Sequence, residues 1–434
     1  MFAYPSTFRL GWLLFCFALA IALTSASSAN EIGVPQNLEA AWKANDKDRR
    51  EYMTGPKTVV AASKNAAKKI ATEAAQYYLY RITLRGAYKF QAVQDQFAID
   101  MAETKKKSDS SFTNLLGPAL VASMKEVLAV QDKKKDAVVI VNAAMMLPAM
   151  GKLKQVDVGN YLVQLANGKE THPIVRYYAL KALKEHMPVT AQHNDNDLDL
   201  TNQGQNAKRK QDAAYVDTLV KFIEEPVETT GMSQPEIEAV RFVRREAIIS
   251  LSAAASPAVL AVNKKQVKKD ILEGPVAPTL LKVLAKGGLQ PPASLQEKVE
   301  AVLGLCAMKH TTMPEYNPDV ATYLIGQTLT DFASDYSVDL ENFIEGVEKK
   351  KIPFLPWKHD AKRLKDGLKK FVENNPETPA AKSLKGLADP VLDFMALHKS
   401  VNVNAFRTQL QAADWLPKEN KAFKTLKTPA IPLK

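Results

Sequence analysis

The sequence of 434 residues has little cysteine and lacks a recognisable metal-binding pattern. Its two cysteines are Cys16 and Cys306, and Cys16 lies in an N-terminal segment that we expect to be removed, so no disulfide can form within the mature chain. Cys306 lies in an apolar helical run and is interpreted as a small buried hydrophobic residue; a nucleophilic or intermolecular thiol is the alternative. The six histidines form no H-E-x-x-H pattern and pair with no cysteine, which argues against zinc.

Linear signatures of catalysis and cofactor binding are also missing. There is no G-x-S-x-G, no phosphate-binding glycine loop and no dinucleotide fingerprint. His193 and the alternating aspartates of Asp195–Asp199 suggest a calcium loop, but Leu200 and Asn206 stand where such a loop needs glycine and glutamate. We therefore expect a solvated acidic turn here, and no metal, cofactor or catalytic residue is predicted.

The N-terminus has the pattern of a secretory signal peptide. Arg9 is the only charged residue before Glu31, and an apolar run at 10–23 precedes a series of small residues. Cleavage after Ala29 is favoured, with Ala26 as the alternative. The run has 14 residues, fewer than the ~20 that span a bilayer, so a retained anchor is the weaker reading. No later stretch approaches a membrane span. We expect an exported protein, periplasmic or extracellular.

The formal net charge is +11, and Arg9 contributes one unit of it. In an exported protein a positive balance favours an anionic partner, such as an envelope polymer, a lipid surface or an acidic protein. Simple solubility is the alternative explanation, and nucleic acid is not an expected partner at that location.

Apolar residues recur at helical spacing through most of the chain, which predicts an all-α protein. Ser233 and Ser294 are each followed three residues later by glutamate, the pattern of a helix-capping box. Tyr77–Leu84 is ambiguous because of its β-branched and aromatic content, and its context favours helix. The predicted helices are 57–80, 112–130, 136–150, 158–165, 173–187, 213–224, 233–255, 267–285, 295–308, 320–333, 339–349 and 361–372, with two or three looser helices up to residue 415.

One helical pattern recurs. Val175–Leu183 and Val243–Leu251 both read V-R-x-x-A-x-x-small-L, and Val139–Leu147 repeats the apolar frame without the arginine. Recurrence of one helix type is typical of stacked helix pairs that bury their apolar faces against neighbours.

The two fragments resemble the second helix of a HEAT-type repeat. The resemblance implies an irregular α-solenoid of stacked antiparallel helix pairs, similar to HEAT and armadillo proteins. It implies that the aliphatic positions are core and that the arginines tie one repeat to the next. These repeat positions are Val175, Arg176, Ala179, Leu183, Val243, Arg244, Ala247 and Leu251.

Composition and periodicity suggest a division of the chain. The expected segments are a signal peptide at 1–29, an N-terminal helical region at 30–110, a HEAT-like region at 111–350 with a polar loop insert at 189–212, a C-terminal helical region at 351–416 and a disordered basic tail at 417–434.

A basic surface is the best exposed-site candidate in the sequence. It surrounds an amphipathic stripe near Trp357 and Phe354, and the alternative is a solvated helix face with these aromatics in the core. Its candidate residues for an anionic partner are Lys358, Lys362, Arg363, Lys365, Lys369 and Lys370.

The leading hypothesis is a non-enzymatic binding or scaffold protein that engages a protein or envelope component on its helical surface. A second is an enzyme or enzyme-assembly factor, because some HEAT-like proteins resemble lyases or factors acting on a bound cofactor. Its mark would be a pocket of ionisable residues with shifted pKa values. A third is a basic protein that binds an anionic polymer or membrane.

Overall fold

The computed structural model describes residues 38–55, 57–83, 90–106, 111–129, 137–168, 171–187, 203–253, 276–308, 318–348 and 357–412. Over these ranges all regular structure is helical, with sixteen α-helices, one short 3-10 helix and no strand. The all-α prediction is confirmed. Across the same ranges, no helix combines the length and apolar character that crossing a membrane requires. The expected signal peptide, the acidic turn and the basic tail lie outside the described residues.

The chain divides into two compact units. Unit 1 comprises residues 1–188 and 233–239, and unit 2 comprises residues 189–232 and 240–434. The expected segment boundaries at 110 and 350 stay a prediction. Helix α4 packs on α6 across the first of these positions, and α13 packs on α15 across the second, so apolar contacts continue through both.

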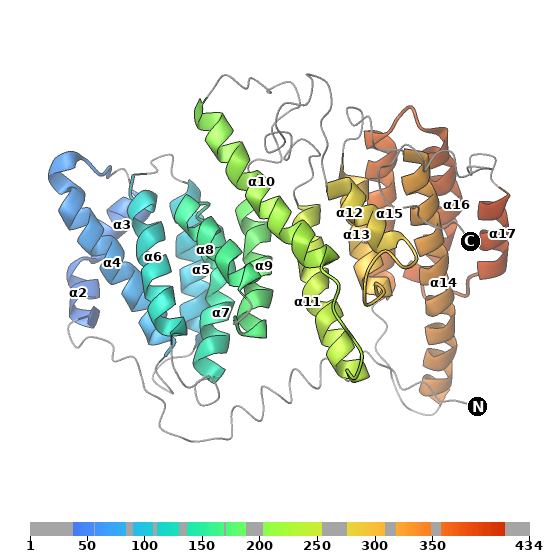
Figure 1. The fold of residues 1–434 in the computed structure, drawn as a ribbon, viewed down its shortest axis with the longest axis horizontal. Coiled ribbons are helices and arrows are strands. Elements are labelled where there is room, and N and C mark those ends of the chain that lie inside the picture. The colour runs from blue at the N-terminus through green and yellow to red at the C-terminus, as the bar shows by residue number, and fades with distance from the viewer. Residues whose placement is uncertain are drawn as a thin grey trace. The chain divides into compact units, whose positions relative to one another are not determined.

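Unit 1 is built from two interlocked series of stacked helices (Figure 1). Helices α2, α4, α6 and α8 pack successively on one another, and α3, α5, α7 and α9 do the same. Contacts between neighbours in the chain join the two series, as in a solenoid of helix pairs. The bounds are α2 Leu38–Ala44, α3 Asp46–Thr54, the 3-10 helix Ala61–Ser63, α4 Lys64–Arg81, α5 Phe90–Lys106, α6 Thr113–Leu128, α7 Ala137–Gly151, α8 Val156–Asn167 and α9 Pro173–His186.

Helix α7 is apolar on nearly every side because it lies between α5 and α9 and is also contacted by α6 and α8. Its last residue, Gly151, marks a close approach to α9. A Cβ built on Gly151 would lie 2.4 Å from the backbone carbonyl oxygen of Ala182. Glycine is therefore required at this contact. Pro148 lies inside α7 and does not end the helix.

Unit 2 repeats the arrangement with longer helices (Figure 1). Helices α10, α12, α14 and α16 pack in succession, α13 packs on α15, and α17 covers α14 and α16. The bounds are α10 Gln203–Glu224, α11 Gln234–Ser252, of which residues 234–239 are counted in unit 1, α12 Val276–Leu284, α13 Leu295–Ala307, α14 Pro318–Glu348, α15 Trp357–Asn374, α16 Pro379–Ala396 and α17 Val403–Gln411.

The predicted capping box forms completely at Ser294 and in part at Ser233. Ser294 donates from its amide and hydroxyl to Glu297 at 2.7 and 2.9 Å, and the Glu297 amide donates back to Ser294 Oγ at 3.3 Å. At α11, the amide and hydroxyl of Ser233 both donate to Glu236 at 2.7 Å. The two helices start at the residues that follow these serines.

Several helix boundaries differ from the expectation: α4 begins at Lys64 although a helix from residue 57 was predicted, and α2, α3 and α5 were not predicted as separate helices. Helix α14 is continuous where two helices were predicted, and within it Ser334 and Ser337 donate to carbonyl oxygens four residues back, at 2.9 and 3.0 Å. Helix α10 begins at Gln203, inside the predicted polar insert. Residues 205–212 contain no glycine or proline and include strong helix formers, which explains the earlier start.

The ambiguous segment at Tyr77–Leu84 is helical as far as Arg81. Tyr78, Leu79 and Tyr80 are all buried, so its aromatic content reflects packing within a helical core and not a strand.

Candidate functional site

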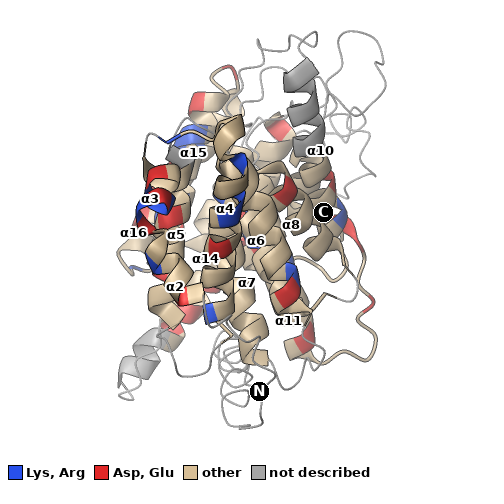
Figure 2. Ribbon diagram, turned by 90° about the vertical axis from the view of Figure 1, so that its left-hand side faces the viewer, with Lys and Arg blue, Asp and Glu red and all other residues tan. Residues whose placement is uncertain are grey.

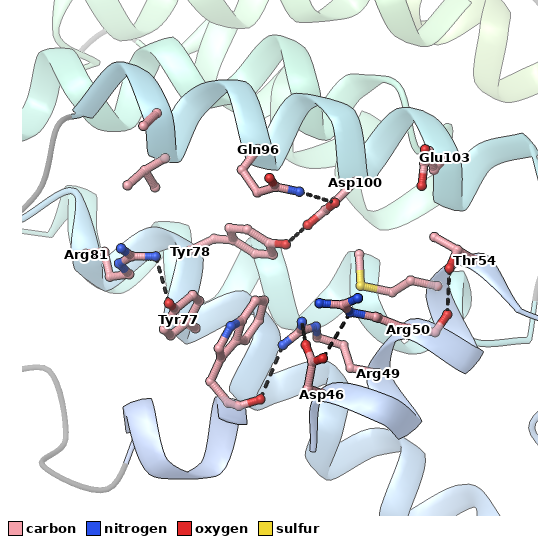
Figure 3. Close-up of a pocket in the computed structure, with 14 residues that line it drawn as sticks. Asp46, Arg49, Arg50, Thr54, Tyr77, Tyr78, Arg81, Gln96, Asp100 and Glu103 are labelled. Carbon is pink, nitrogen blue, oxygen red and sulfur yellow. Dashed lines mark hydrogen bonds and ion pairs between the residues drawn. The ribbon is translucent and has the colours of Figure 1, made fainter. Parts of the chain in front are cut away.

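A pocket of about 800 Å³ lies in unit 1 among α2, α3, α4 and α5 (Figure 3). Its lining combines aromatic rings, guanidinium groups, carboxylates and a few aliphatic side chains. The lining residues are Trp42, Asp46, Arg49, Arg50, Met53, Thr54, Tyr77, Tyr78, Arg81, Ala92, Val93, Gln96, Asp100 and Glu103.

Helix α3 supplies the basic side of the pocket, and Figure 2 shows basic and acidic positions adjacent on it. Asp46 in its first turn is spaced to reach both arginines, three and four residues later. Arg49 Nη2 donates to Asp46 Oδ1, and Arg50 Nε lies 3.0 Å from Asp46 Oδ2. One carboxylate is thus shared by two guanidinium groups, so this cluster keeps one unit of positive charge. We call Asp46, Arg49 and Arg50 the α3 wall.

Arg49 is held rigidly because it also lies on an aromatic ring. Its guanidinium is 3.3 Å from the centroid of the Trp42 ring, and Tyr77 stacks on Trp42 at 3.8 Å with an interplanar angle of 10°. At such short distances the two partners must occupy opposite faces of the indole. Arg49 is buried, and burial lowers the pKa of its guanidinium. The charges of Asp46 and Asp100 oppose this lowering.

Helix α5 supplies the acidic side, which we call the α5 wall: Gln96, Asp100 and Glu103. The Tyr78 hydroxyl donates to Asp100 Oδ2, and Gln96 Nε2 donates to Asp100 Oδ1 at 2.7 Å (Figure 3). Burial raises the pKa of Asp100 from 3.8 to about 6, although Arg49 and Arg50 across the pocket oppose the shift. Asp100 is therefore largely ionised at neutral pH.

The pocket thus places walls of opposite charge on its two sides. In the described residues Asp100 accepts only from neutral donors, and Arg50 pairs only with Asp46. The two walls attract each other without a direct ion pair between Asp100 and either arginine. Such a site can hold a ligand that carries complementary charges, and it can also move a proton at Asp100.

The structure places the basic surface predicted from the sequence on α15, outside this pocket. Arg363 donates to Glu300 at 2.9 and 2.6 Å and to Asp360 at 3.1 Å, and Lys365 donates to Asp393 at 2.6 and 2.7 Å. Both cations are therefore neutralised by neighbouring helices. The exposed members of the set are Lys358, Lys362, Lys369 and Lys370. An anionic partner for them stays a prediction.

Trp357 does not contribute to that surface. It is 8% exposed, makes edge contacts with Phe332 and Tyr336, and donates from Nε1 to Asp339 at 3.0 Å. The reading in which this aromatic belongs to the core is the correct one. Phe354 lies outside the described residues.

The repeat positions lie largely in the core. Val243 was expected to be a core residue, but it is only half-buried. The buried positions are Val175, Ala179, Leu183, Ala247 and Leu251, none more than 3% exposed.

The two repeat arginines make different contacts. Arg176 of α9 donates to the carbonyl oxygen of Gly168, just after α8, at 2.6 Å. Arg244 of α11 forms a buried ion pair with Glu297 of α13, with its Nε 2.6 Å from Oε1. Arg244 thus links two helices, whereas Arg176 contacts the turn that precedes its own helix, and a role of these arginines in tying one repeat to the next stays a prediction.

Cys306 is fully buried, and burial raises the pKa of its thiol. The structure therefore supports its interpretation as a core residue. Within the ranges listed above, no group of three or more His, Cys, Asp or Glu side chains is arranged to hold a metal ion.

Sequence reasoning missed the pocket because its members are spread over 62 positions, from Trp42 to Glu103. The only local signal was the charge-dense stretch Asp46–Arg50. Such a stretch on a helix is usually a solvated face, and only the fold brings Asp100 opposite it.

Comparison with known proteins gives no family, no curated protein and no solved structure with a significant match to this chain.

Proposed function

We propose that this chain is an exported, non-enzymatic binding protein of HEAT-like helical repeats, and that its ligand occupies the pocket of α2–α5. The single observation that carries the proposal is the pocket itself. It is concave, is formed by regular helices and joins apolar with charged groups, as ligand sites do. Its volume of about 800 Å³ also lies within the ~300–1,000 Å³ range of such sites.

The organisation of the polar groups supports binding. Arg49, Asp46 and Trp42 form a rigid cluster whose hydrogen bonds are already made, so it would pay little entropy on ligand binding. Export and the HEAT-like repeats remain part of the proposal. They are supported by the N-terminal sequence pattern and by the Arg244–Glu297 link between α11 and α13.

The experiment uses two tryptophan substitutions on α5. Ala92 is exposed and lines the pocket, so Ala92→Trp should fill the pocket without disturbing the core. Ile99 is 53% exposed on the same helix and does not line the pocket, which makes Ile99→Trp the matched control. The mature protein and both variants are incubated with envelope extract from the producing cells, and bound molecules are detected by native mass spectrometry.

We expect the unmodified protein and Ile99→Trp to retain the same bound molecule. Ala92→Trp should abolish this retention, because its side chain fills the pocket. Retention by all three proteins, or by none, would contradict the proposal.

An enzyme is the second candidate, favoured by one observation. The pKa of Asp100, raised to about 6 by burial, would suit a group that exchanges protons near neutrality. Tyr78, which is hydrogen-bonded to Asp100, and Arg50, across the pocket, would then orient a substrate. Asp100→Asn tests the enzyme candidate on a ligand identified by mass spectrometry. If Asp100 acts in catalysis, the substitution would eliminate turnover of that ligand. If the unmodified protein does not change the ligand chemically, the enzyme candidate is excluded.

A further inference from the structure

We infer that the pocket of α2–α5 recognises a short zwitterionic peptide, with its terminal carboxylate on Arg50 and its terminal ammonium on Asp100. This inference rests on the proposed function of the same pocket and names its ligand class. It follows from the juxtaposition of the α3 wall and the α5 wall, which face each other across the pocket (Figure 3).

The α3 wall has unused capacity for an anion. Arg50 uses only its Nε for Asp46, so both of its terminal nitrogens remain available to a ligand. These two donors match the two oxygens of a carboxylate. Arg49 behind it is fixed by Asp46 and by the Trp42 ring, and it adds positive charge without needing to move.

The α5 wall has unused capacity for a cation. Each carboxylate oxygen of Asp100 accepts one hydrogen bond from a neutral group, Tyr78 or Gln96. A carboxylate offers about four acceptor positions, so a ligand ammonium can still bind. Glu103 stands exposed at the rim and strengthens the negative potential there.

The Trp42 ring of the pocket is not available to a flat ligand. Both faces of the Trp42 ring are occupied, one by Arg49 and one by Tyr77, so a sugar or a nucleobase cannot stack on it. The neutral surface between the walls includes Met53, Ala92 and Val93, which suit an aliphatic chain. A peptide with small side chains has such a chain between its two charged ends.

The size is consistent with a tripeptide. The pocket volume of about 800 Å³ leaves room for a tripeptide, which is about 10 Å long when extended at ~3.4 Å per residue. Trialanine is therefore a suitable probe, because it carries both terminal charges and only methyl side chains.

The test compares trialanine with N-acetyltrialanine and trialanine amide, each of which lacks one terminal charge. Affinities are measured by isothermal titration calorimetry with the mature protein. We expect trialanine to bind and each cap to weaken binding at least tenfold. Asp100→Asn should remove the discrimination against the acetyl cap, and Arg50→Gln the discrimination against the amide cap.

Two matched controls test whether the variants act locally. Asp95 accepts from Gln91 at 2.8 Å on α5, as Asp100 does from Gln96, but does not line the pocket, so Asp95→Asn should leave all three affinities unchanged. Lys47→Gln, at an exposed position of α3 outside the lining, is the control for Arg50→Gln. Circular dichroism confirms that every variant folds.

Equal affinity for trialanine and its capped forms, or no binding of any of them, would overturn the inference, because recognition is assigned to the two charged ends. The proposed function would survive either result if Ala92→Trp still abolishes retention of a ligand from the envelope extract. If the terminal charges of trialanine do not affect binding and Ala92→Trp does not abolish ligand retention, both the inference and the proposed function are refuted.

Discussion

Replacement of Glu297 by glutamine should destabilise unit 2 by about 3 kcal/mol, the lower end of the range for breaking a buried ion pair. The side chains of Arg244 and Glu297 are 3% and 0% exposed, so neither can turn to water when its partner is neutralised. Arg244 Nε and Nη2 donate to Glu297 at 2.6 and 3.3 Å. Glutamine can still accept one hydrogen bond and keep the cap of α13, but it leaves the guanidinium charge buried without a counter-charge.

The second half of this experiment removes the stranded charge. Arg244→Met combined with Glu297→Gln should recover most of the loss, because methionine fills part of the space and needs no counter-charge. Arg244 Nη1 is already buried with no hydrogen-bond partner in the structure described, so the methionine also removes an unsatisfied donor. We expect the double variant to lie within about 1.5 kcal/mol of the unmodified protein.

Urea unfolding followed by circular dichroism measures the effect. With a slope of about 2 kcal/mol per molar urea, a loss of 3 kcal/mol lowers the unfolding midpoint by about 1.5 M. Glu236→Gln is the matched control, since Glu236 caps α11 in the same way but is exposed and has no buried arginine beside it. Equal midpoint shifts for Glu297→Gln and Glu236→Gln would refute the reasoning.

Three further perturbations test other parts of the structure. Because the pKa of Asp100 is raised to about 6, the native state binds more protons than the unfolded state between about pH 4 and pH 6. The stability of the unmodified protein relative to Asp100→Asn should therefore fall as the pH rises through that window. Urea unfolding at several pH values measures this difference. Gly151→Ala should cost about 1–3 kcal/mol in the same assay, because its Cβ would meet the carbonyl of the facing helix. By contrast, Gly386→Ala should gain about 0.5–1 kcal/mol on an open helix surface. Reversing two lysines of α15, Lys362→Glu with Lys369→Glu, should weaken binding to vesicles containing anionic lipid at least tenfold at low salt in a sedimentation assay, if that surface docks on anions.

Each of these has its own control. Asp95→Asn should leave the pH dependence unchanged, and a stability curve for Asp100→Asn that parallels the unmodified protein between pH 4 and pH 6 would contradict the pKa shift. Destabilisation by Gly386→Ala as large as by Gly151→Ala would show that steric contact does not decide the effect. Lys64→Glu with Lys68→Glu, at exposed positions of α4, should leave vesicle binding intact. Vesicle binding unchanged between low and high salt would exclude the anionic surface.

The fold was predictable from the sequence to the extent that it depends on local patterns. The capping serines and the proline at the start of α9 fixed helix starts correctly, because each acts through backbone groups within one turn. The aliphatic frame around Ala179 and Ala247 identified buried faces, since small residues repeated at helical spacing leave room for a neighbouring helix.

The missed features depend on contacts that no local pattern contains. Where α14 continues through Ser334–Val338, serine hydroxyls bond within the helix and Tyr336 is buried. Trp357 was ambiguous in the sequence because a tryptophan beside lysines suits both a membrane surface and a core, and only its packing on Phe332 decides between them.

The candidate site shows why function was harder to predict than fold. Arg49 and Arg50 form a pattern that a solvated helix also has, and Asp100 lies fifty positions further along the chain. Stacking α3 on α5 converts these separate charges into facing walls, and burial of Asp100 then follows from the fold and not from its sequence neighbours. The chemistry of this pocket is thus a product of helix stacking. Its ligand preference should accordingly be more sensitive to changes that shift α3 against α5 than to conservative changes elsewhere in unit 1.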